Sequence, residues 1–228
     1  MANLPFGILD TDPSITTLTN PFNIHSNYGS ADYDVHHYFS ANFVLTDMFR
    51  HAGFHYGPNR VFGGWTLSSN WFFRTGLPFT PIDNADVAPL LGLNYSGSIF
   101  ASPVTSISAN CNNAVNTPCL STSQFAPSGL LTGFGTAGRN SLRGPNFFDV
   151  DMALMKDVKL TERITFSFGA HAYNLLNHAN FDQPVNDISN PQFGYSIAAV
   201  GPPTSLLGSF VGAGSSPRFV EIKGILRF

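Results

Sequence analysis

The sequence predicts an all-β protein, a portion of an antiparallel transmembrane β-barrel with about five long strands and long external loops. Three observations lead to this fold class. Segments of about ten residues alternate polar and apolar side chains. Charged residues make up only 11% of the 228 residues, against roughly 25% in soluble domains. Phe is abundant at 22 residues, and 21 Gly and 16 Pro favour turns over long helices.

The stretch 217–228 shows the alternation most clearly. Its apolar and its charged residues fall on opposite faces of a period-two pattern, which is typical of a strand and not of a helix. The apolar face carries Val220, Ile222, Gly224, Leu226 and Phe228, and the other face carries Glu221, Lys223 and Arg227.

Four further segments repeat the pattern: 35–45, 61–74, 147–158 and 163–174. Each is long enough to cross a bilayer as a tilted strand, for which about 9–11 residues suffice. Alternation alone would also describe a soluble β-sandwich, whose apolar faces pack together. The strand length favours the membrane, because strands of globular proteins usually have about 5–6 residues.

The connections between these segments are unequal in length. A short turn joins 147–158 to 163–174, whereas 81–146 and 175–215 are long. Short turns on one side and long loops on the other are typical of outer-membrane barrels. We therefore expect two parts: residues 1–32 as a loop or strand remnant from an upstream part of the barrel, and 33–228 as its C-terminal strands, with 81–146 and 175–215 as external loops.

Catalytic, metal and cofactor sites are not expected. The stretch GFGTAG (133–138) matches G-x-G-x-x-G but follows a Ser/Pro-rich loop, and no strand–loop–helix context supports dinucleotide binding. Asp149 and Asp151 share the polar face of one strand, where solvated wall charges explain them better than acid–base catalysis. The net charge of −3 gives no reason to expect a nucleic-acid partner. A disulfide between Cys111 and Cys119, in the polar stretch NCNNAVNTPC, indicates an oxidising compartment, although two unrelated thiols are the alternative.

Longer blocks carry a family resemblance. They are YDVHHYFSANFVL (33–45), GGWTLSSNWFFRTGLPFTP (63–81), GTAGRNSLRGPNFFDVDMALMKD (135–157), FSFGAHAYNLLNHANFDQP (166–184), FG (193–194) and SPRFVEIKGILRF (216–228). In this order they resemble the C-terminal part of Oar-like TonB-dependent receptors. Three residues depart from the family pattern: His36 and Tyr38 stand where basic residues are expected, and His171 stands where an acidic residue is expected. These departures concern the charges of the polar face and not the fold.

The resemblance implies a non-catalytic receptor in the Gram-negative outer membrane, without a cofactor. Its expected partners are outer-membrane lipid, the barrel assembly machinery, the remainder of the barrel with its plug, and TonB through an upstream region. The last strand resembles the terminal signature that outer-membrane proteins present for assembly, which makes Phe228, Leu226 and Ile222 the expected signal residues.

Five strands cannot close a barrel around a plug, and an open edge leaves backbone groups unpaired in lipid. We therefore expect the chain to be a fragment of a larger protein. No basic segment precedes an apolar core at the N-terminus, so we expect any export signal to lie upstream. Two alternatives stay open: a complete small porin or adhesin barrel, and a secreted soluble β-sandwich that binds sugars.

Overall fold

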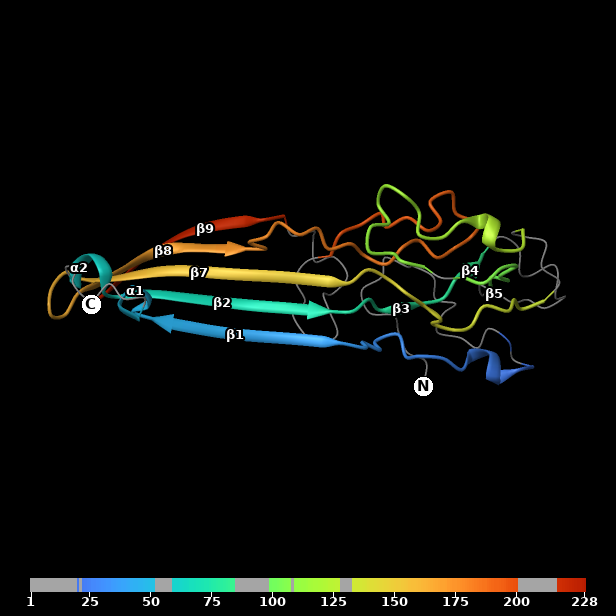
Figure 1. Ribbon diagram of the computed structural model, residues 1–228, viewed down its shortest axis with the longest axis horizontal. Coiled ribbons are helices and arrows are strands. Elements are labelled where there is room, and N and C mark those ends of the chain that lie inside the picture. Colours follow the sequence, from blue (N-terminus) through green and yellow to red (C-terminus); the bar gives the residue numbers. More distant parts are fainter. Residues whose placement is uncertain are drawn as a thin grey trace. The chain divides into compact units, whose positions relative to one another are not determined.

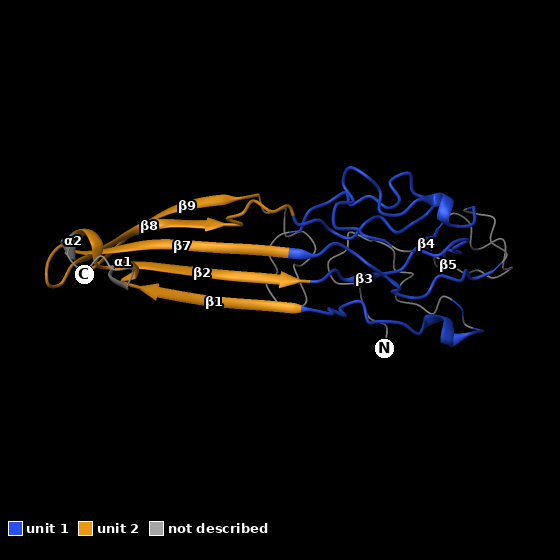
Figure 2. Ribbon diagram, viewed as in Figure 1, with its two compact units in different colours: residues 1–37, 75–147, 180–215 blue, residues 38–74, 148–179, 216–228 orange. Residues whose placement is uncertain are grey.

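The computed structural model describes residues 20, 22–51, 59–84, 99–107, 109–127, 133–200 and 217–228. The chain forms two compact units, each assembled from three separate stretches (Figure 2). Unit 1 comprises Met1–His37, Thr75–Phe147 and Asn180–Ser215. Unit 2 comprises Tyr38–Arg74, Phe148–Ala179 and Ser216–Phe228.

Unit 2 is built on a five-stranded sheet in the order β1-β2-β7-β8-β9 (Figure 1). The strands are β1 (Tyr38–Thr46), β2 (Trp65–Arg74), β7 (Phe147–Lys159), β8 (Thr165–Tyr173) and β9 (Phe219–Arg227). β1 pairs antiparallel with β2, and β8 pairs antiparallel with both β7 and β9. The predicted all-β antiparallel fold is confirmed, and each strand overlaps one of the alternating segments. Among the described residues the sheet is open, with β1 and β9 at its edges.

The register keeps the two faces of the strands separate across the sheet. Phe166 lies opposite Leu226 and Ala170 opposite Ile222, so the apolar residues of β8 and β9 share one face. His171 lies opposite Glu221 on the other face. A shift of one residue would place every apolar side chain among polar ones, so the alternation itself selects this register.

Residues 160–164 form the short turn between β7 and β8. The backbone N–H of Leu160 donates to the carbonyl of Ile164 over 2.9 Å, which closes the turn. The hydroxyl of Thr161 accepts from the N–H of Ile164 at 3.0 Å. A threonine in this place therefore satisfies backbone donors that no strand partner reaches.

The connection between β1 and β2 lies at the same end of the sheet as this turn (Figure 1). It contains two short helices, α1 (Met48–His51) and α2 (Asn59–Phe62). Phe49 contacts the rings of Phe62 and Trp65 edge-on, with centroids 6.4 and 5.6 Å apart. The side chain of His51 and all of His55, which have metal-like spacing in the sequence, lie outside the described residues.

Unit 1 contains short pieces of regular structure joined by irregular chain. β3 (Pro78–Phe79) pairs with β6 (Leu142–Arg143), and β4 (Ile82–Asp83) pairs with β5 (Ile99–Phe100). Two 3-10 turns, η2 (Ile24–Asn27) and η3 (Thr122–Gln124), carry side-chain caps from Asn23 and Ser121. β4, β5, β6 and η3 lie in 81–146, which is expected from the sequence to be an external loop, and η2 lies in 1–32, which is expected to be a loop or strand remnant.

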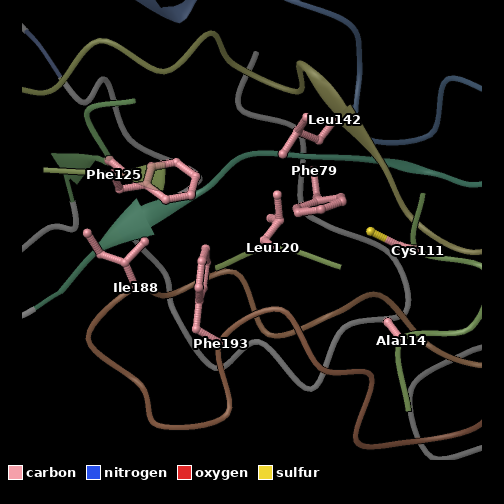
Figure 3. Packing of buried hydrophobic residues seen from close by; sticks show 9 residues of the cluster. Phe79, Cys111, Ala114, Leu120, Phe125, Leu142, Ile188 and Phe193 are labelled. Carbon is pink, nitrogen blue, oxygen red and sulfur yellow. The ribbon is translucent and has the colours of Figure 1, made fainter. Parts of the chain in front are cut away.

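Unit 1 nevertheless has its own hydrophobic core, drawn in Figure 3. The rings of Phe125 and Phe193 meet edge-on at 5.5 Å. The buried members of this core are Phe79, Ala101, Cys111, Ala114, Leu120, Phe125, Leu142, Ile188 and Phe193. Stretches far apart in the sequence are thus held together by burial of apolar area, which contributes about 25 cal/mol per Å².

A disulfide joins Cys111 to Cys119 at the border of this core. Cys111 is buried within the core, and Cys119 packs against it. The bond closes the polar stretch between them and removes conformational freedom from the unfolded chain.

Candidate functional site: the two faces of the five-stranded sheet

The apolar face of β8 and β9 is exposed. Ile222 is 87% exposed, Leu226 53% and Phe168 40%. Soluble monomers rarely present a contiguous apolar surface of this kind. The face therefore suits a hydrocarbon environment, and it is not folded into a sandwich core within the described part of the chain.

Lys156 is the exception on the apolar face. It lies in register with Phe168 yet is only 4% exposed. Its ammonium group donates to the carbonyl of Val61 at 3.1 Å and to that of Gly63, and it lies 5.3 Å from the centre of the Trp65 ring. Backbone carbonyls and an aromatic face thus compensate the buried charge at the end of the sheet.

The opposite face is polar and carries a shallow hollow of about 260 Å³. Three consecutive residues from each of β1, β2, β7 and β8 line it. Its lining on the polar face includes Asn42 from β1, Ser68 and Asn70 from β2, Asp151 from β7, and His171 and Tyr173 from β8, together with the apolar Val44 and Ala153. Asn42 lies directly opposite Asn70 in the register, so two side-chain amides meet in one row.

Two local interactions fix the rim of this hollow. A carboxylate oxygen of Asp151 accepts from the backbone N–H of Asn174 at 3.0 Å. The Tyr173 ring is stacked against Phe219 of β9, with centroids 6.2 Å apart. Asn174 itself adopts a left-handed backbone conformation, and its amide caps the turn through two hydrogen bonds to the backbone of His178. The block YNLLNH is therefore a turn motif that places Tyr173.

The residues expected to form an assembly signal lie on the apolar face of β9 or directly after it. Phe228 is 95% exposed, and Leu226 and Ile222 are exposed as well. They are accessible for recognition by a partner.

The glycine-rich stretch 133–138 has a packing role. Gly135 has a φ of +73°, and a Cβ there would collide with the carbonyl of Phe100. The close approach of two backbones explains this glycine, and no helix follows it in the described part of the chain. The described part of the chain contains no group of three or more side chains that could hold a metal ion.

Polar residues of the long connections are engaged in structural contacts. Arg143 donates to a carboxylate oxygen of Asp34 at 2.6 Å and lies 2.6 Å from Nε2 of His36. The buried amide of Asn140 donates to Asp32 at 2.6 Å, and its backbone N–H donates to the Thr80 hydroxyl. These contacts account for Arg143 and Asn140, so we assign neither side chain to ligand binding, although both lie in a long connection.

The contact with Arg143 makes the Asp34 region sensitive to acid. The hydrogen bond from Arg143 holds the pKa of Asp34 below its ordinary value. A depressed pKa means that the folded state favours the ionised carboxylate, so the stabilisation is present above about pH 4 and is lost as the pH falls through the folded pKa. We expect Asp34→Asn to flatten the acid limb of a stability profile recorded between about pH 2 and pH 6.

The control is Glu162→Gln, which removes an exposed carboxylate of the β7–β8 turn that forms none of the described ion pairs and should alter the profile less than Asp34→Asn does. An Asp34→Asn protein with the wild-type acid limb would show that the contact with Arg143 does not contribute.

Among the described residues, no helix is long and apolar enough to span a membrane. A family model for an outer membrane beta barrel domain matches residues 7–206. Searches of curated proteins and of solved structures returned no match.

Proposed function

Because this chain belongs to the family of outer membrane beta barrel domains, we propose that it forms the C-terminal barrel wall of a TonB-dependent, Oar-like receptor in the Gram-negative outer membrane. The observation that carries the proposal is the sheet with an exposed apolar face and a polar face. Hydrocarbon would cover the first and a wet lumen the second. The ordered sequence blocks that resemble Oar-like receptors give the finer assignment.

In this proposal the wall has no bond-making role. The receptor binds a solute or an exported peptide through its external side, and energised movement of a plug admits the ligand. TonB is contacted through a region upstream of this chain. Further strands pair with β1 and β9, because each unpaired backbone group in lipid costs several kcal/mol.

The experiment is cell fractionation combined with transport. The natural protein that contains this chain should sediment with the outer membrane and require detergent for extraction, and uptake should stop when TonB is inactivated. Recovery from the soluble periplasmic fraction would refute the proposal. Uptake that continues without TonB would favour a passive porin.

We also propose that the alternating residues Ile222, Leu226 and Phe228 are recognised during barrel assembly. Phe228→Ala should lower the amount of folded protein in the outer membrane, because it removes the terminal aromatic side chain of the signal. Phe228 is exposed and has few internal contacts to lose, so a decrease would not reflect lost packing. The measurement is the fraction that shows heat-dependent mobility in gel electrophoresis. Phe22→Ala is the matched control, since Phe22 is 80% exposed in unit 1. Equal amounts of the two variants would contradict the assignment.

A further inference from the structure

We propose that the hollow on the polar face of unit 2 is a binding site for one ring of a neutral oligosaccharide. The inference rests on the proposed function, because it assigns a ligand class to the wall that faces the lumen. It starts from a place where residues of four neighbouring strands converge: Asn42, Asn70, Asp151, His171 and Tyr173.

The charge of the lining selects a neutral ligand. Neither lysine nor arginine is among the residues that line the hollow, so an anionic group would find no charged donor there. Asp151 is the one carboxylate in the lining, and one of its oxygens already accepts from Asn174. A cationic group would meet this single carboxylate and would leave the two side-chain amides without a partner.

The hydrogen-bonding groups suit hydroxyls. Each side-chain amide offers both donors and acceptors, as vicinal hydroxyls do. Neither Asn42 nor Asn70 uses its side chain in a hydrogen bond with another described residue. Because the two lie opposite each other in the register, one ring can reach both.

Tyr173 supplies an apolar surface in the same hollow, on β8, with β7 between it and the strand of Asn70. Its side chain is 36% exposed, and Phe219 supports the ring by stacking at 6.2 Å with an interplanar angle of 23°. A pyranose has an apolar C–H face and an equatorial rim of hydroxyls. A hollow that holds both an accessible aromatic ring and side-chain amides matches both features, whereas an aliphatic ligand would leave the amides unpaired at a cost.

The size of the hollow limits what it holds. About 260 Å³ is below the usual 300–1,000 Å³ of sites for drug-sized ligands. It accommodates a single ring, so the remainder of an oligosaccharide would extend along the lumen.

The test is calorimetric titration of the natural protein, extracted from the outer membrane in detergent, with maltotetraose, cellotetraose and chitotetraose. Tetra-alanine serves as the peptide probe. We expect at least one tetrasaccharide to bind and tetra-alanine not to bind.

Tyr173→Ala should weaken the binding about tenfold, the equivalent of a lost aromatic contact. Tyr173→Phe keeps the stacking face and should change the affinity by less than about threefold. Tyr28→Ala is the matched control, because Tyr28 is 88% exposed in unit 1, and it should bind like the wild type.

Asn70→Ala should weaken binding several-fold, because one hydrogen bond is lost. Heat-dependent mobility verifies that each variant is folded.

The inference is overturned if the folded wild type binds none of the tetrasaccharides, if it binds tetra-alanine instead, or if Tyr173→Ala binds like the wild type. These results are distinct from failure of the proposed function. A protein that fractionates with the outer membrane and requires TonB but ignores sugars refutes only the ligand class. A sugar-binding protein that remains in the periplasm refutes the receptor wall.

Discussion

Ile222→Arg is expected to destabilise the membrane-inserted barrel by about 2–4 kcal/mol, the cost of an arginine on the lipid face near the bilayer midplane. Ile222 lies near the middle of β9, and its side chain is 87% exposed on the apolar face. A surface substitution in water usually changes stability by less than about 0.5 kcal/mol. The size of the effect therefore reports which medium covers this face.

Ile225→Arg is the matched control, because it makes the same substitution in the same strand on the opposite face. Ile225 lies opposite Ser167 in the register and is partly exposed. An arginine there points toward water in a barrel, so we expect a change of less than about 1 kcal/mol. The free energy of unfolding is measured by denaturant titration of the protein in liposomes.

A destabilisation that is equal for the two arginine variants would show that both faces see the same environment. A neutral Ile222→Arg with a damaging Ile225→Arg would reverse the assignment of the faces. Either outcome would remove the physical basis for a barrel wall.

The strands could be predicted from the sequence because their signal is local. A period of two over about ten residues is visible from neighbouring residues alone. The structure forms β8 and β9 where 163–174 and 217–228 alternate. The same alternation fixes the register, since a polar face and an apolar face must each continue across the sheet. The fold class follows from these local facts.

Unit 1 could not be predicted in this way. Its core residues lie in chain that has no repeating pattern, and they meet only after long-range folding, as Phe79, Leu120 and Phe193 do. The stretches 81–146 and 175–215 are expected to be loops because they are long connections between alternating segments. The scattered Phe and Leu residues within these stretches indicate that some apolar side chains are buried. Their positions in the sequence do not show which residues they pack against.

The candidate site was partly accessible from the sequence. Alternation places Asn42, Asn70, Asp151 and His171 on the polar face, but it does not say which of them are close together. That depends on the register between strands separated by long connections, such as β2 and β7. The burial of Lys156 could not be predicted either, because its carbonyl partners belong to the β1–β2 connection, which is far from Lys156 in the sequence.

Gly169→Ala is expected to destabilise the sheet by roughly 1–3 kcal/mol, the usual cost of overpacking a well-packed site. Gly169 lies opposite Met155 on β7. A Cβ at this position would collide with the carbonyl of Leu154 and would lie 2.8 Å from the Cα of Met155. Both atoms belong to the backbone of the neighbouring strand, so no side-chain rotation relieves the clash and the β7–β8 pair must separate.

Gly224→Ala in the adjacent strand is the matched control. A Cβ there meets only the Phe166 ring, with its nearest atom at 3.7 Å, which is ordinary van der Waals contact. Alanine also restricts the unfolded chain more than glycine does, which adds about 0.4–1 kcal/mol where the backbone tolerates it. We therefore expect Gly224→Ala to be neutral or slightly stabilising in the same denaturant titration. If both alanine variants unfold at the same denaturant concentration, β7 and β8 do not approach each other as closely as this register requires, and the polar row that His171 contributes to the hollow would have to be placed differently.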